Sequence, residues 1–253
     1  MIKFFRKIRY DLMEKNKTGK YFKYAIGEII LVVIGILLAL SINNWNEDRK
    51  EKAIVKNVLK NIRYDLIADT IKFSSDLKKI PSFLNSAKFL LNNTEFDTIS
   101  ANSLFNKLPY SAYSYKIKNQ SYEKVINTGI TDFFEYNELF DDINTYYTID
   151  SNGHDVVKKW DSDETTKDGS YWITMGFEID IFSDNLFYKE NEIEFTQQEV
   201  DRKAVFLEQL KTPNIRNSIK MNLYRKMRLI ETLQNMKQRA KDIILKIDEQ
   251  LKE

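Results

Sequence analysis

The sequence predicts a mainly α-helical protein with a single transmembrane helix near its N-terminus. The 253 residues include only 7 glycines and 3 prolines, and 30% are charged, a composition that favours long helices over turn-rich β-structure. One segment is apolar enough to span a bilayer. Apolar residues recur at helical spacing directly after that segment and again near the C-terminus. The transmembrane helix is therefore expected to continue into a long amphipathic helix that pairs with a long C-terminal helix. A mostly helical cap is expected between the two.

These patterns divide the chain into three parts. A basic amphipathic segment is expected on the cytoplasmic side, followed by a transmembrane anchor and an extracytoplasmic helical domain. Within that domain the two paired helices form a stalk. The boundaries are 1–19 for the basic segment, 20–45 for the anchor and 46–253 for the domain, with the stalk at 46–80 and 212–253 and the cap at 81–211.

The anchor is the most distinctive stretch of the chain. No residue from Ile29 to Leu40 is charged. As a helix, the stretch from Tyr24 to Trp45 would measure about 32 Å, close to the hydrocarbon thickness of a bilayer. Aromatic residues flank it on both sides, as is typical of the membrane interface. Two other interpretations remain open: a signal peptide cleaved near Ser41, and a buried helix of a soluble core.

Charge predicts the orientation of this helix. Residues 1–23 contain eight basic and two acidic residues, whereas acidic and basic residues are mixed after the span. The positive-inside rule then places the N-terminus in the cytoplasm and the long remainder on the opposite side.

One acidic residue, Glu28, lies inside the apolar run. On a helix it shares a face with Val32, Gly35 and Ala39, and Gly35 and Ala39 form a small-xxx-small pair of the kind that lets helices approach closely. The face is a candidate helix–helix interface with a second copy or a partner protein. The alternatives are a carboxylate that reaches toward the headgroups and nearby lysines, and a proton path.

The N-terminal segment predicts contact with a membrane surface. Phe5, Ile8 and Leu12 recur at helical spacing. The basic residues, which fall largely on other faces, suit anionic lipid headgroups. An arm that binds nucleic acid is the alternative, but a direct link to a span favours the bilayer, so no nucleic-acid partner is expected. The candidate surface residues are Lys3, Arg6, Lys7 and Arg9.

Three stretches carry a resemblance to a known family. "FFRKIR", "GKYFKYAIGEIILVVIGILLAL" and "INNWNEDRK" resemble the start of a bacterial family of single-pass membrane proteins of unknown function. A weaker similarity covers "SYEKVINTG" and "NELFDDINTYY" in the middle of the chain. The resemblance implies an uncleaved N-terminal anchor. Combined with the charge distribution, it leads us to expect a protein of the bacterial inner membrane with the bulk of its chain in the periplasm. It implies no activity, substrate or catalytic residue.

Start and stop signals delimit the two stalk helices. Apolar residues follow Trp45 at helical spacing, and Pro81 is expected to end that helix. Thr212 and Pro213 form a helix start. Two seven-residue series follow, each with one lysine, and they indicate either an amphipathic helix against a core or a self-associating coiled coil. The series are Ile219, Lys226, Leu233, Ala240, Ile247 and Leu223, Ile230, Lys237, Ile244, Leu251.

The sequence contains no recognisable catalytic, cofactor-binding or metal-binding motif. The chain has no cysteine, and its one histidine, His154, is expected in a solvated loop. The stretch from Asp161 does not match a calcium-binding loop, because Thr166 stands where the motif requires glycine and Trp172 where it requires glutamate. A solvated acidic loop is expected there instead. "YWITMGFEIDIF" alternates enough for a short strand pair or irregular structure.

The expected role is therefore a structural, assembly or interaction module at the envelope, with a protein partner or as a homo-oligomer, and without enzymatic activity. A ligand-binding sensor that works through a partner is the first alternative, because about 23 cytoplasmic residues are too few for an output domain. An enzyme with a carboxylate site is the second, and it would require a cleft with convergent acids.

Overall fold

The computed structural model describes residues 6, 10, 18–179 and 195–252, apart from the side chains of residues 18, 20 and 21. The chain divides into two compact units, Met1–Asn57 and Val58–Glu253, with the boundary inside the first long helix. The described residues are mainly helical and contain no strand, as the composition predicts.

The first unit is the N-terminal part of helix α2, which runs from Thr18 to Asn92. From Ile26 to Trp45 the large apolar side chains are exposed to an unusual degree. This helix is long and apolar enough to cross a membrane, and none of its most apolar window is buried within the chain. The length and exposure agree with the predicted anchor.

Helix α2 does not end at Pro81, contrary to the expectation from sequence. The helix continues to Asn92 with Pro81 in its interior. An interior proline removes a backbone hydrogen bond and crowds the preceding turn. On either side of it, however, Ile80, Ala87 and Leu90 are buried, so tertiary packing offsets the local preference.

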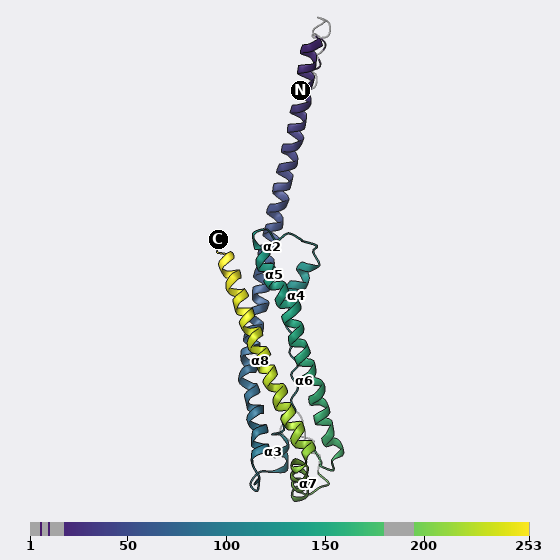
Figure 1. Cartoon of the computed structure of the whole chain (residues 1–253), viewed down its shortest axis with the longest axis vertical. Coiled ribbons are helices and arrows are strands. Elements are labelled where there is room, and N and C mark those ends of the chain that lie inside the picture. Colours follow the sequence, from purple (N-terminus) through teal and green to yellow (C-terminus); the bar gives the residue numbers. More distant parts are fainter. Residues whose placement is uncertain (1–5, 7–9, 11–17, 180–194, 253) are drawn as a thin grey trace. The chain divides into compact units, whose positions relative to one another are not determined.

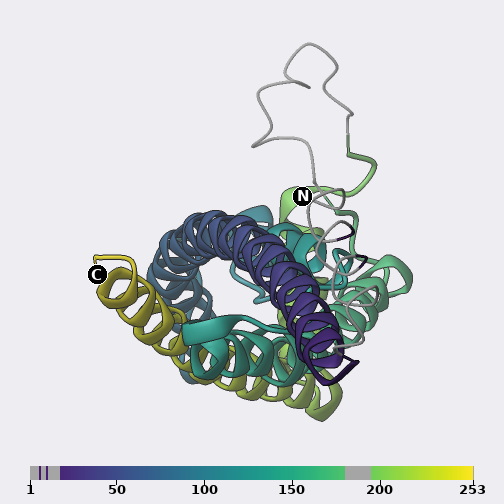
Figure 2. The same ribbon diagram turned by 90° about the horizontal axis from the view of Figure 1, so that it is seen from above.

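The second unit is built on three long helices: residues 58–92 of α2, α6 (Ser151–Tyr171) and α8 (Pro213–Gln250) (Figure 1). Residues 58–92 and α8 run antiparallel. Near one end Arg63 donates two hydrogen bonds to Asp248, at 2.6 and 3.1 Å, and near the other Arg216 donates to the carbonyl of Leu91 at 2.9 Å. Helix α6 lies along α8, as the end-on view also shows (Figure 2).

Helix α6 is the end of a longer helical run. It follows α5 (Asn137–Thr145) and a π-helical turn, η2 (Tyr146–Asp150), without a break. The predictions of a solvated loop at His154 and of an acidic loop from Asp161 are therefore wrong. Gly153 and His154 lie in the first turn of α6, and the acidic stretch from Asp161 lies in its second half. Beyond Tyr171 the described residues form a short 3₁₀ turn, η3 (Trp172–Thr174), and irregular structure, not a strand pair; residues 180–194 lie outside the described part.

Helix α8 begins as the sequence predicts. The Thr212 hydroxyl accepts a hydrogen bond from the Ile215 N–H at 3.4 Å, and Pro213 occupies the first helical position. All five members of the Ile219 series are buried, including Lys226, whereas the Leu223 series is only partly buried. A third series completes the seam that faces the other helices: Asn222, Leu229, Met236 and Ile243.

The shorter helices close the two ends of the bundle. At one end α3 (Ala101–Phe105) packs on α7 (Glu199–Lys211) around an aromatic core, where Trp172 stacks on Phe206 with ring centroids 5.0 Å apart. Toward the other end lie α4 (Gln120–Ile126) and the 3₁₀ turn η1 (Phe134–Tyr136), joined through Gly129 at a φ of 73°, a conformation that favours glycine.

Candidate functional site

The predicted helix interface lies on the exposed part of α2. Glu28 is half-buried, whereas Val32, Gly35 and Ala39 are exposed. Apart from its chain neighbours and the nearby backbone of its own helix, a Cβ atom at Gly35 would meet no atom of the described residues within 4 Å. The small-residue face is thus not packed against any described residue of its own chain, and its role as an interface stays a prediction.

The predicted basic surface is described only in part. Arg6 is helical and exposed. Lys3, Lys7 and Arg9 lie outside the described residues.

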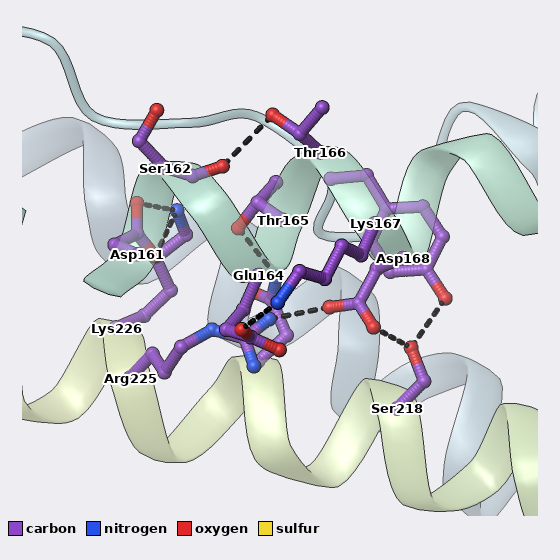
Figure 3. Close-up of polar contacts among 12 residues, drawn as sticks. Asp161, Ser162, Glu164, Thr165, Thr166, Lys167, Asp168, Ser218, Arg225 and Lys226 are labelled. Carbon is purple, nitrogen blue, oxygen red and sulfur yellow. Dashed lines mark hydrogen bonds and ion pairs between the residues drawn. The ribbon is translucent and has the colours of Figure 1, made fainter. Parts of the chain in front are cut away.

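A different polar cluster, which the sequence did not predict, lies in the interior of the second unit. The segment from Pro109 to Asn119 has no helix of its own and runs between the long helices. The fully buried Asp161 of α6 accepts from the backbone N–H of Tyr113 at 2.9 Å. The Asp161 carboxylate also accepts hydrogen bonds from the Lys226 ammonium at 2.7 and 2.8 Å (Figure 3). Lys226 donates a further hydrogen bond to the Ser111 carbonyl at 2.6 Å.

This ion pair extends along the interface between α6 and α8. The Thr165 hydroxyl accepts from the Asn222 amide at 3.1 Å, and Asp168 binds both Arg225 and the Ser218 hydroxyl, the latter at 2.6 Å (Figure 3). Burial lowers the pKa of Lys226, and the hydrogen bonds and charge of Asp161 act in the opposite direction. Three consecutive polar layers therefore fix the register of the two helices.

A second buried acid, Asp69 of α2, binds the C-terminal half of the segment 109–119. It accepts from the Tyr115 hydroxyl at 2.5 Å and from the Lys118 N–H at 3.1 Å, and the Tyr146 hydroxyl lies 3.5 Å from its second oxygen. Burial raises the pKa of Asp69 to about 6, even though these hydrogen bonds lower it. A carboxyl group with such a pKa is suited to proton transfer, but here its partners belong to the chain itself, so its contacts fasten the segment.

His154 is buried in the same interior, not solvated as predicted. Its ring lies beside Phe73 and Tyr113, with centroid distances of 6.1 and 5.9 Å. Burial lowers the pKa of His154, which favours the neutral imidazole. Among the described residues no three His, Asp or Glu side chains are grouped so that they could hold a metal ion.

The comparisons with known proteins give one match. Residues 28–175, more than half of the chain, match a family of unknown function, DUF6090. The chain belongs to this family. No curated protein and no solved structure matches it. The matched region includes most of the anchor, Asp69, the segment 109–119 and all of α6, but not α8, which supplies Lys226.

The raised pKa of Asp69 predicts a pH dependence of stability. The pKa is about 6 in the folded chain against an ordinary value of 3.8. The folded chain therefore binds a proton at Asp69 more tightly than the unfolded chain does. The stabilisation that results is complete below about pH 4 and is lost as the pH rises through 6. Asp69→Asn removes this loss while keeping an acceptor for Tyr115 and Lys118. Relative to the parent, the variant should gain about 3 kcal/mol of unfolding free energy between pH 4 and pH 7.

Urea unfolding of both proteins in detergent micelles across this range measures the difference. Tyr115→Phe serves as the comparison: it removes a hydrogen bond that lowers the Asp69 pKa, so the pH-dependent loss should move to higher pH. A difference between Asp69→Asn and the parent that stays constant with pH would show that Asp69 is not the titrating group.

Proposed function

We propose that this chain is a single-pass protein of the bacterial inner membrane whose helical domain acts as an interaction module in the periplasm. The observation that carries the proposal is the complete exposure of the apolar window of α2. In water such a surface would be very costly, whereas a bilayer covers it. The buried interior of residues 58–253, by contrast, is that of a water-soluble bundle.

The orientation follows from the charge distribution. The excess of basic residues before Tyr24 favours a cytoplasmic N-terminus, with residues 46–253 on the periplasmic side. The basic segment would then lie against anionic lipid headgroups of the inner leaflet. Trp45, which is exposed at the far end of the apolar run, suits the opposite interface.

An interaction role is supported by the small-residue face of the anchor. Gly35 and Ala39 leave room for another helix, and no described residue of the chain fills it. In a bilayer, helices associate through close packing more than through hydrophobic burial. A second copy of this chain is the simplest occupant, because it presents the same face.

Fusion of an alkaline phosphatase reporter after Glu253 tests the topology. This enzyme matures only outside the cytoplasm, so the fusion should be active, and the protein should stay in the membrane fraction after carbonate washing. An inactive reporter would indicate the opposite orientation, with the C-terminus in the cytoplasm. A soluble product trimmed near Ser41 would instead identify the apolar run as a cleaved signal.

Gly35→Leu tests the helix interface. Leucine at this position blocks close approach, so association between differently tagged copies, measured by crosslinking in native membranes, should fall sharply. Glu28→Gln should have a smaller effect, because polar bonds between membrane helices contribute only about 1 kcal/mol each. Gly27→Leu is the matched control, since Gly27 lies on another face of α2 and its variant should associate like the parent. Equal association of all four proteins would mean that the anchor is not an interface.

A further inference from the structure

The second unit contains a cavity that none of the contacts described above explains. Its volume is about 420 Å³, which is within the range of small-molecule sites. It lies between α2 and the segment 109–119, with α8 contributing to its wall. The lining residues are Lys72, Asp76, Lys79, Ile80, Phe83, Ser111, Ala112, Tyr113, Ser114, Tyr115, Lys116, Lys226 and Leu229.

The charge of the lining is unbalanced. Four lysines and one acid contribute to it. Two of the lysines are paired: Lys226 with Asp161, and Lys72 with Asp76. The other two, Lys79 and Lys116, are exposed and form no ion pair with any described residue. The cavity therefore carries an excess of positive charge that an anion would balance.

The rest of the lining is suited to an organic group. Ile80, Phe83 and Leu229 supply apolar surface, and Tyr113 and Tyr115 add aromatic rings. The hydroxyls of Ser111 and Ser114 add groups that can donate to an anionic oxygen. Apolar walls combined with a few convergent polar groups are typical of ligand sites.

We propose that this cavity binds a small organic anion, a phosphate or carboxylate that carries one ring or a short apolar chain. Lys79 and Lys116 hold the anionic group, and the apolar group packs on Phe83. A cationic ligand is disfavoured, because the single lining acid, Asp76, is already paired with Lys72. The volume suits one compact ligand and not a lipid with two long chains. The proposal is independent of the anchoring and topology proposed above, since every lining residue lies within Val58–Glu253.

Calorimetric titration of the full chain in an uncharged maltoside detergent tests the proposal, with phenyl phosphate as the probe. Phenyl phosphate should bind, whereas benzylamine and benzyl alcohol at the same concentrations should not. Lys79→Glu/Lys116→Glu should weaken binding about 10-fold or more, because two attractive charges become repulsive. Lys79→Arg/Lys116→Arg should retain it.

Lys124→Glu/Lys241→Glu is the matched control. It makes the same change in net charge at two exposed lysines that do not line the cavity, and its affinity should equal that of the parent. Phe83→Ala should weaken phenyl phosphate binding and leave any binding of inorganic phosphate unchanged. The proposal is overturned if phenyl phosphate does not bind at millimolar concentration, if benzylamine binds instead, or if the two charge-reversed double variants bind equally.

Discussion

The buried ion pair between Asp161 and Lys226 is the interaction on which the arrangement of residues 58–253 depends. It joins α6 to α8 and holds a non-helical segment between them. Two charges removed from water are costly unless they are paired and their remaining hydrogen bonds are made. Here the backbone of Ser111 and Tyr113 completes the set. Removal of one member of such a pair typically costs about 3–5 kcal/mol, so the pair also disfavours other helix registers.

The segment 109–119 explains why the interior of this bundle contains acids at all. An extended chain without a neighbouring strand has backbone groups that need partners when they are buried. Asp161 accepts from Tyr113, Asp69 accepts from Lys118, and Lys226 donates to Ser111. The side chains of three helices thus replace the partners that a sheet would supply. The same segment forms one wall of the cavity, so the polar core and the proposed anion site share a structural origin.

The long helices were predictable from sequence because their signals are local or periodic. The exposed apolar run, the Thr212–Pro213 start and the Ile219 series all appear in the structure as expected. The ends of the helices and the residues in their interior were less predictable, because contacts between residues far apart in the sequence determine them. Pro81 is a helix-breaking residue that tertiary contacts override, and the glycine next to His154 resembles a loop signal although it lies in α6.

The buried charged residues could not have been grouped from their spacing in the sequence, because Asp69, Asp161 and Lys226 come from three separate regions of the chain. One signal was available: Lys226 occupies an apolar position of the heptad series, and a lysine there requires a buried partner. The partner itself, in an acidic stretch that resembles a solvated loop, is identified only by the fold.

Amide hydrogen exchange of the segment 109–119 tests this account most directly. If buried carboxylates hold the segment, the N–H groups of Tyr113 and Lys118 should be protected about as strongly as those in the middle of α8, although they belong to no helix or sheet. The amides of the exposed Ala112 and Ser114 should exchange much faster and serve as internal controls. Exchange of Tyr113 and Lys118 at the rate of Ala112 and Ser114 would contradict the account, because the segment would then be a surface loop and not part of the core.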